Sequence, residues 1–361
     1  MKKNDLGLIE EKINHKETID VEDARAILKS NDLIGIAMLA RKIKLRKTQD
    51  KIYFVFNKHI NYSNLCISKC KFCAFYRNGN EPDAYTMSIE NIIDEIAKMP
   101  KGIREVHIVG GLHPNLQFSY YVDMISSIKK HFPTINIKAF TAAEIDHFSK
   151  ISGLDYESVL KTLKEAGLDS MPGGGAEVFS ERVRKKLYPN KIPYEKWAQI
   201  HILAHDMGIP TNATLLFGHI ETDDEIIDHL FKLRHLQEIS PKFLCFIPLS
   251  FHPQNTIFEG RITKVDAVRE LKVLSLSRII LDNFPHIKAY WVMLSPKVSQ
   301  IGMHFGADDI DGTIGQERVT HAAGAKSPIG LAKEKMVNTI KNAGFTPVER
   351  DALYNELEIY N

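Results

Sequence analysis

A chain of 361 residues with 44% hydrophobic and 25% charged side chains is long enough to form one large hydrophobic core and too apolar to be intrinsically disordered. Its net charge is only +2, and acidic and basic residues are mixed along the sequence, so we expect neither a nucleic-acid-binding patch nor a membrane-surface patch. No apolar run is long enough to span a bilayer, and the N-terminus lacks the apolar centre of a signal peptide, which predicts a cytoplasmic protein.

Residues 1–50 are polar and show helical periodicity. Apolar side chains recur every three or four positions over 21–30 and 33–47, which predicts two or three helices ahead of the main domain. The basic stretch 40–47 lies inside this pattern, and we interpret it as a solvated helix face. The sequence therefore predicts an N-terminal helical extension.

From residue 51 onward, short apolar runs alternate with amphipathic segments. The runs predict seven strands, with an eighth candidate at 305–315, and the amphipathic segments predict helices. The predicted strands are 51–60, 104–111, 135–142, 168–175, 210–218, 242–250 and 287–294. The predicted helices are 88–99, 119–132, 155–167, 194–208, 223–237 and 266–281.

This alternation indicates an α/β protein with a parallel sheet and crossover helices. A TIM-type (β/α)8 or slightly open barrel accounts for a repeated region of about 300 residues better than a doubly wound sheet, which periodicity alone leaves open. No linker or low-complexity tract divides the chain. We therefore expect a catalytic barrel domain over 51–345 and a C-terminal tail over 346–361.

Polar and glycine-rich stretches follow the predicted strands. In a barrel these loops share the rim formed by the carboxyl ends of the strands, where such folds place their active sites. The stretches are 61–73, 110–114, 142–144, 172–177, 218–222 and 250–253.

Three of the four cysteines, Cys66, Cys70 and Cys73, lie close together in the first of these loops. Their spacing places three soft thiolates on one loop, which suits an iron–sulfur cluster. A structural zinc site usually has four protein ligands, and the fourth cysteine, Cys245, belongs to a distant strand pattern. Zinc completed by a histidine such as His59 stays open as an alternative. Three ligands to a four-iron cluster would leave one iron free for an external ligand.

The motif Cys66-x3-Cys70-x-Phe72-Cys73 resembles the signature of the radical S-adenosylmethionine superfamily. This resemblance implies a 4Fe-4S cluster on the three cysteines, with Phe72 beside the cofactor. It also implies that the open iron binds S-adenosylmethionine as a co-substrate. An external electron donor such as flavodoxin or ferredoxin would allow its cleavage to a 5′-deoxyadenosyl radical.

Other strand-end residues are candidates for binding the cofactor. Gly110 and Gly111 resemble the superfamily's glycine pair, whose backbone binds the methionine amino group, and glycines let a main chain approach a ligand closely. Glu177 is a candidate for the ribose hydroxyls, with a helix-start carboxylate as its alternative role. Thr222 is expected to cap the next helix. The remaining candidates are Gly174, Gly175, Gly218 and Glu221.

Four polar residues at separate strand ends are candidates for the catalytic, substrate-facing part of the site. For each of them a purely structural role is the alternative, because no local pattern assigns it a task. They are His113, Glu144, His219 and His252.

Residues 50–345 resemble the aminofutalosine synthase family of the futalosine route to menaquinone. Val109, Thr141, Ala142, Leu249 and His252 match this family rather than its cyclase paralogue. The resemblance implies that the radical adds to 3-[(1-carboxyvinyl)oxy]benzoate. Aryl migration and loss of a carboxyl group would then give 6-amino-6-deoxyfutalosine and methionine. Because this substrate carries two carboxylates, we expect bidentate arginine or charged histidine partners at the rim.

Three other functions stay open. One is the cyclic dehypoxanthine futalosine synthase, which abstracts hydrogen and closes a ring. Another is a related deazaflavin-forming radical enzyme, and a third, from a different class, is a zinc-stabilised binding or scaffold protein. Colour separates the last from the first two, because a zinc protein is colourless and an iron–sulfur protein is brown.

Overall fold

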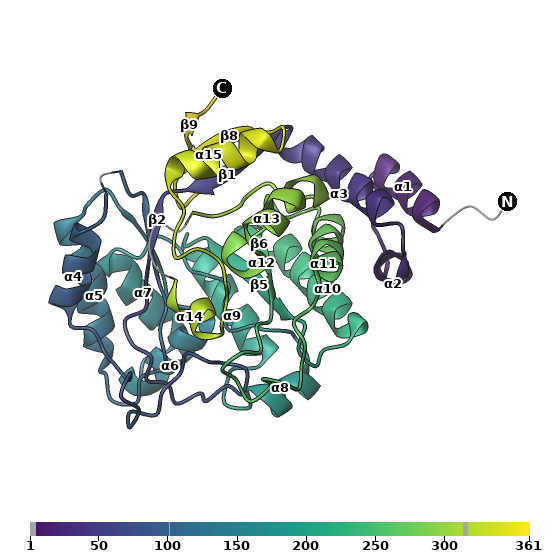
Figure 1. The fold of residues 1–361 in the computed structure, drawn as a ribbon. Coiled ribbons are helices and arrows are strands. Elements are labelled where there is room, and N and C mark those ends of the chain that lie inside the picture. Colours follow the sequence, from purple (N-terminus) through teal and green to yellow (C-terminus); the bar gives the residue numbers. More distant parts are fainter. Residues whose placement is uncertain (1–4, 101, 313–316) are drawn as a thin grey trace.

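The computed structural model describes residues 5–100, 102–312 and 317–361. Three helices precede the first strand, as the periodicity predicts: α1 (Asp5–His15), α2 (Val21–Lys29) and α3 (Leu33–Thr48). They form the purple end of the chain in Figure 1. Helices α2 and α3 both pack against α11 (Ala267–Ile280), so the N-terminal helices are joined to the main body.

The described strands form three sheets of three strands each. One contains β1 (Lys51–Val55), β8 (Thr346–Arg350) and β9 (Glu356–Ile359), and β8 pairs with β9 in the antiparallel sense. The second contains β2 (Asn57–Ile60), β3 (Glu105–Ile108) and β4 (Asn136–Ala139). The third contains β5 (Thr211–Phe217), β6 (Phe243–Ser250) and β7 (His286–Ile287). All other strand pairs are parallel.

Isolated parallel bridges connect the three sheets. Strands β1 and β2 are separated only by Phe56, so one extended segment contributes to two sheets. In the described ranges the strands therefore follow one another around a barrel-like wall, but not as one continuous closed sheet. The bridging pairs are Lys138 with Ser170, Met171 with Thr211, Tyr53 with Asp309 and Lys288 with Asp309.

Helices cover the outside of this wall (Figure 1). Besides α11, the predicted long helices are α4 (Ile89–Ala97), α5 (Phe118–His131), α7 (Tyr156–Ala166), α9 (Tyr194–Asp206) and α10 (Asp223–Ile239). Thr222 caps α10, as expected. Helices not predicted are α6 (Ala142–Ser152), α8 (Glu181–Leu187), α12 (Trp291–Leu294), α13 (Pro296–Gly302), the 3₁₀ helix η1 (Met303–Phe305), α14 (Arg318–Ala322) and α15 (Lys333–Asn342).

Two predicted strands are wrong in detail. Of 168–175, only Ser170 and Met171 form bridges, and the three glycines that follow have no side chains to pack in a sheet. A Cβ on Gly173 would lie 2.5 Å from the backbone of Ala213, so close packing replaces strand pairing there. The strand predicted at 287–294 ends at Ile287, and 291–294 is helical.

The eighth strand candidate, 305–315, is only partly described. Residues 313–315 lie outside the described residues. Within the described part, Asp309 makes the bridges to Tyr53 and Lys288, which places this segment between β7 and β1.

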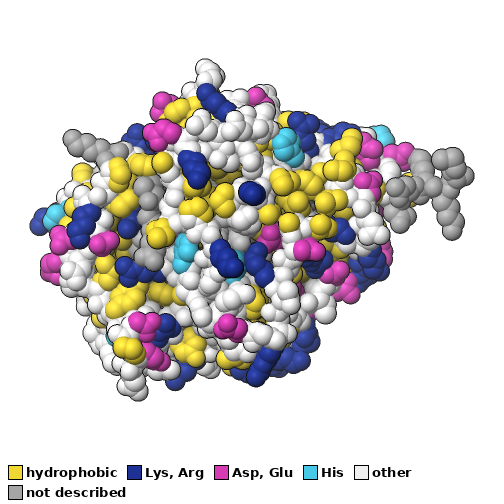
Figure 2. Space-filling view, in the orientation of Figure 1, with side chains coloured by type: hydrophobic (Ala, Val, Ile, Leu, Met, Phe, Trp, Pro, Cys, Tyr) yellow, Lys and Arg dark blue, Asp and Glu magenta, His cyan; other side chains and the backbone are white. Residues whose placement is uncertain are grey.

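Acidic and basic side chains are interspersed on the face shown in Figure 2, and Lys and Arg atoms gather at its lower edge over α8. Among the described residues, no helix combines the length and apolar character needed to cross a membrane. The barrel-like wall and the carboxyl ends of its strands are therefore the part of the fold that positions a site.

Candidate active site

A cavity of about 350 Å³ lies at the carboxyl ends of the strands. Its lining comes from the loop after β2, the ends of β3, β4, β5 and β6, and the segments around Tyr290 and Glu317. This is the rim at which the sequence places the site. Eleven of the predicted site residues line it: Cys66, Cys70, Phe72, Cys73, Gly110, Gly111, Glu144, Gly174, Gly175, Glu177 and His252.

The three clustered cysteines carry free thiols that face this one cavity. The Leu112 N–H donates to the Cys66 sulfur at 3.3 Å, and the Ser68 hydroxyl lies 3.2 Å from the Cys70 sulfur. In the part of the chain that the structure describes, no three His, Cys, Asp or Glu side chains are already gathered around a position for a single metal ion. Ligation by these cysteines therefore stays a proposal, supported by their spacing and shared cavity.

The thiols of Cys70 and Cys73 are buried, so they lose their protons there only when a cationic group compensates the negative charge. Burial raises the pKa of Cys70 to about 12 and also raises the pKa of Cys73. Lys191 opposes both shifts, but it does not outweigh the loss of solvation. A thiolate forms in such a place when a metal replaces the proton, because metal ligation deprotonates a coordinating thiol. The donor set therefore fits an iron–sulfur cluster.

Tyr62 and Glu144 form a buried hydrogen-bonded pair behind the glycine pair. The Tyr62 hydroxyl donates to Glu144 Oε1 at 2.8 Å, and the Gly110 N–H donates to the same oxygen at 3.2 Å. The Thr141 N–H and hydroxyl donate to Oε2 at 2.7 and 2.9 Å, within the capping box of α6. Burial raises the pKa of Glu144 despite these donors. Glu144 therefore has a structural role whatever its role toward a substrate.

The glycine pair is also required by packing. A Cβ on Gly110 would lie 2.6 Å from the Tyr62 ring, and a Cβ on Gly111 would lie 2.1 Å from the Leu65 carbonyl oxygen. Any larger residue would displace the cysteine loop, since Leu65 directly precedes Cys66. The binding of a methionine amino group by this pair stays a prediction.

We expect Tyr62→Phe to lower the free energy of unfolding by about 1–3 kcal/mol, because it removes a donor from a buried carboxylate oxygen. Urea unfolding measures the change. Tyr121→Phe is the matched control, since Tyr121 is equally buried and its ring lies 5.5 Å from that of Tyr62, but its hydroxyl has no hydrogen-bond partner among the described residues. Equal losses in the two variants would contradict the assignment of the stabilisation to the Glu144 contact.

Glu177 and Lys191 form an ion pair on the wall beside the thiols. Burial alone would lower the pKa of Lys191, but the Glu177 carboxylate outweighs it and the pKa of Lys191 is raised. The ammonium also lies 5.5 Å from the centroid of the Phe72 ring. Glu177 has a φ of 49° and Gly175, two residues before it, has a φ of 92°, so both residues of this turn lie in the left-handed region. A ribose bound by Glu177 would share the carboxylate with Lys191.

The histidine candidates divide between the cavity and its surroundings. His252 lines the cavity, its Nε2 lies 2.9 Å from the Met293 carbonyl oxygen, and burial lowers its pKa. His113 does not line the cavity, and its Nδ1 accepts from the N–H groups of Asn115 and Leu116 at 3.1 and 3.0 Å. It is therefore engaged within its own loop.

The stretch after β5 also lies outside the cavity lining. His219 Nε2 is 3.0 Å from the Leu216 carbonyl oxygen, and Glu221 accepts from the N–H groups of Gly218 and His219. These contacts close the loop on itself. Roles for Gly218, His219, Glu221 and His113 toward cofactor or substrate stay predictions.

Sequence reasoning missed several lining residues, including Lys191 and Thr214. His107 and Asn212 are the most prominent of them, because each places a polar side chain in the cavity from within a strand. The only signal in the sequence was the alternation within β3, which does not distinguish a cavity-facing polar residue from a solvent-facing one.

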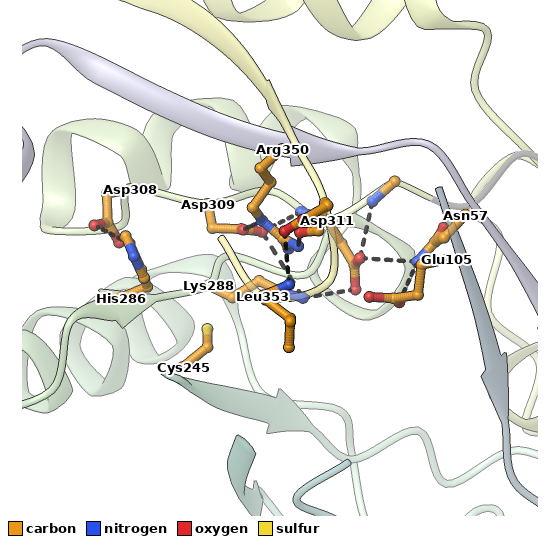
Figure 3. Close-up of polar contacts among 12 residues, drawn as sticks. Asn57, Glu105, Cys245, His286, Lys288, Asp308, Asp309, Asp311, Arg350 and Leu353 are labelled. Carbon is orange, nitrogen blue, oxygen red and sulfur yellow. Dashed lines mark hydrogen bonds and ion pairs between the residues drawn. The ribbon is translucent and has the colours of Figure 1, made fainter. Parts of the chain in front are cut away.

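A buried charge network lies at the inner end of the cavity (Figure 3). Lys288 Nζ lies 3.0 Å from Asp311 Oδ2 and 3.8 Å from Asp309 Oδ1, and Arg350 Nε donates to Asp309 Oδ2 at 2.6 Å. Asp311 lines the cavity, so the network forms part of the cavity floor. Its members are Asn57, Glu105, Lys138, Lys288, Asp309, Asp311 and Arg350.

Comparison with known proteins decides the family. Residues 60–233 match the Radical SAM superfamily, and residues 240–361 match the CofH/MqnC C-terminal region. An aminodeoxyfutalosine synthase of Thermus thermophilus is 43% identical over 98% of this chain and 96% of its own length.

The chain belongs to the radical SAM superfamily.

Of two further relatives, one has the same name as the Thermus thermophilus protein and the other has a different name. The aminodeoxyfutalosine synthase of Streptomyces coelicolor is 38% identical, over 99% of this chain and 96% of its own. A 5-amino-6-(D-ribitylamino)uracil–L-tyrosine 4-hydroxyphenyl transferase of Methanopyrus kandleri is 40% identical, over 91% of this chain and 90% of its own. The protein is therefore a radical SAM enzyme, and this assignment leaves the zinc-stabilised scaffold without support.

Solved structures share the fold of this radical SAM enzyme. Methylornithine synthase (PylB) has a TM-score of 0.74 at 17% identity and covers 94% of this chain and 97% of its own. The FeFe-hydrogenase maturase HydG of Carboxydothermus hydrogenoformans has a TM-score of 0.75 at 17% identity, covering 98% of this chain and 81% of its own. The expected barrel-type fold is confirmed, and family membership implies S-adenosylmethionine and a 4Fe-4S cluster.

Proposed function

We propose that this radical SAM enzyme is an aminodeoxyfutalosine synthase. The similarity to two proteins of that name over 98% and 99% of the chain carries the proposal. In the proposed reaction, the 5′-deoxyadenosyl group adds to the enol-ether carbon of 3-[(1-carboxyvinyl)oxy]benzoate and the aryl group migrates. One carboxyl group leaves as carbon dioxide or bicarbonate, and the products are 6-amino-6-deoxyfutalosine and methionine.

In this proposal Cys66, Cys70 and Cys73 hold the 4Fe-4S cluster. When bound, such a cluster would supply one-electron transfer from a carrier such as flavodoxin or ferredoxin to S-adenosylmethionine. The protein contributes positioning, because a radical must meet one carbon of the substrate before it meets water or another hydrogen donor. The apolar part of the cavity wall suits that task, and it includes Val109, Leu112, Leu216, Ile247, Leu249 and Phe251.

The second candidate is a hydroxyphenyl transferase reaction, and the 40% identity to the Methanopyrus kandleri protein of that name favours it. In both candidate reactions an aromatic substrate must share the cavity with a partner that carries a sugar or sugar-alcohol chain. The two candidates differ in what must be supplied as substrate, so an experiment with defined substrates separates them.

The test is anaerobic turnover of the iron- and sulfide-reconstituted protein with dithionite and S-adenosylmethionine, read by mass spectrometry. One reaction contains 3-[(1-carboxyvinyl)oxy]benzoate, another contains 5-amino-6-(D-ribitylamino)uracil with tyrosine, and a third contains dehypoxanthine futalosine. We expect a product only in the first, joining the adenosyl and benzoate parts with one carboxyl group lost. A product in the second or third reaction alone would replace the proposal with that activity.

A further inference from the structure

The inner end of the cavity holds two polar side chains that no motif singled out, His107 on β3 and Asn212 on β5. A parallel strand advances about 3.3 Å per residue, so His107 lies roughly 10 Å before Gly110 along its strand, and Asn212 lies roughly 20 Å before Gly218. Both side chains are therefore set well below the rim that carries the three thiols.

Asn212 is 2% exposed, and its carboxamide oxygen has no hydrogen-bond partner among the described residues. The pairing of β5 with β6 shifts register between Thr211 and Asn212, and such irregularities commonly re-aim a side chain beside a binding site. Buried polar groups nearly always have a partner. The oxygen and the NH₂ group of a carboxamide exchange places when the amide turns, so the Asn212 side chain can offer either an acceptor or a donor to a ligand in the cavity.

His107 presents a neutral imidazole to the same cavity. Its ring stacks on that of His59 with centroids 4.6 Å apart, and it is not hydrogen-bonded to any other described residue. Burial lowers its pKa to about 3, so at neutral pH it carries one N–H donor and no charge. Among the charged groups that act on His107, Glu105 is paired with Lys138 at 2.7 Å and Asp311 is paired with Lys288 at 3.0 Å.

The charged side chains in the cavity lining are mostly acidic. Glu144, Glu177, Asp311 and Glu317 line it, and Lys191 is the one lysine or arginine among the described lining residues. Because Lys191 is already paired with Glu177, the arginine partners expected for a dianionic substrate are not found there. An anionic ligand group at the inner end must then bind to neutral N–H donors.

We propose that His107 and Asn212 bind the ring carboxylate of the substrate at the inner end of the cavity. This inference rests on the proposed function. The enol-ether double bond must lie at the thiol end, where the adenosyl group becomes reactive, so the carboxylate on the benzene ring points inward. The imidazole N–H donates to one carboxylate oxygen. The carboxamide, turned so that its NH₂ group faces the ligand, donates to the other.

The test uses 2-phenoxyacrylate, which is the same enol ether without the ring carboxylate. We expect the wild type to favour the full substrate over this analogue in kcat/KM by about 10- to 100-fold, as for the loss of hydrogen bonds to a charged group. In Asn212→Leu and His107→Phe the preference should fall by about 10-fold or more. His107→Phe keeps a ring for stacking on His59.

Asn212→Asp tests whether the ligand group beside residue 212 is negatively charged, because the substitution adds a negative charge and keeps the shape of the side chain. A like charge beside the ligand carboxylate should raise KM for the full substrate most of all, while S-adenosylmethionine binding and cluster content stay unchanged. Tighter binding in Asn212→Asp would show that the ligand group is a donor or a cation and would overturn the proposal. Calorimetric titration of reconstituted protein with the full substrate gives the same comparison without turnover.

Asn283→Asp is the matched control, since Asn283 also has an unpartnered carboxamide oxygen and its NH₂ group donates to the Arg234 carbonyl at 2.9 Å, outside the cavity lining. It should leave the substrate preference unchanged. If the wild type forms no futalosine product, the proposed function fails. If it forms the product but the Asn212 and His107 variants keep the full preference, only the carboxylate assignment is overturned.

Discussion

Replacement of Cys66, Cys70 or Cys73 by alanine will give a folded protein that no longer takes up a stable iron–sulfur cluster. Each thiol faces the same cavity, and with three protein ligands proposed there is no spare cysteine in the loop to replace a lost one. Iron and sulfide content after anaerobic reconstitution, together with the visible charge-transfer absorption, measures the loss. Turnover with any substrate should be abolished in the same variants.

Cys245→Ala is the matched control for this loss. Cys245 is fully buried in β6, and its thiol lies 3.5 Å from the Phe246 carbonyl oxygen, away from the cavity. We expect wild-type iron content in this variant. Retention of full iron and sulfide by any one of the three loop variants would remove that cysteine from the ligand set.

The second large effect is expected from Lys288→Met, which we predict will lower the free energy of unfolding by about 3–5 kcal/mol. Lys288 is buried between Asp309 and Asp311, and its removal leaves two buried carboxylates with only Arg350 and hydrogen bonds to balance them. Removing one partner of a buried charge pair costs far more than the pair contributes net, because the remaining charge has lost its solvation. Denaturant unfolding of the apoprotein measures this change.

The effect of Lys288→Met should depend on pH. Burial would raise the pKa of Asp311, but Lys288 outweighs it and holds that pKa below its usual range. The stabilisation is therefore present above the ordinary pKa of an aspartate and is lost as the pH falls through the folded-state pKa. The difference between wild type and Lys288→Met should be largest at neutral pH and shrink in acid, where the carboxylate of the variant can protonate.

Lys51→Met serves as the comparison, since Lys51 forms an exposed ion pair with Glu356 at 2.8 Å. Exposed pairs contribute about 0–1 kcal/mol, so this variant should unfold almost like the wild type. If Lys288→Met lowers the free energy of unfolding no more than Lys51→Met does, Lys288 does not stabilise the buried carboxylates of Asp309 and Asp311 as the geometry indicates.

The alternation of apolar runs and amphipathic segments predicted most strands and the long helices, because strands such as β5 are buried at every residue whereas helices such as α4 bury one face. It failed at 168–175, where the apolar run ends in glycines whose backbone packs against Ala213 without forming a ladder. It also missed α6, because only Thr141 separates the apolar end of the strand segment, at Phe140, from Ala142 at the helix start. The capping box of Thr141 and Glu144 was the local signal for that helix start.

The cluster loop could be predicted because its three cysteines, Cys66, Cys70 and Cys73, lie close together in the sequence. The contacts that shape the rest of the site are long-range, and periodicity contains no information on them. Tyr62 and Glu144 are 82 positions apart, and Lys191 reaches Glu177 across a whole helix. His107 and Asn212 looked like ordinary strand residues, since a sequence does not show which buried polar atoms lack a partner.

The junction between Met171 and Thr211 is one of the places where the cavity wall is joined by an isolated bridge instead of a ladder. Separating β5 from β6 would break a ladder that runs along the whole of β5, whereas parting the wall at this bridge breaks few backbone hydrogen bonds. Local opening follows the route of lowest free energy. We therefore expect the backbone amides at the junction of Met171 with Thr211 to exchange hydrogen faster than those along the ladder of β5 and β6.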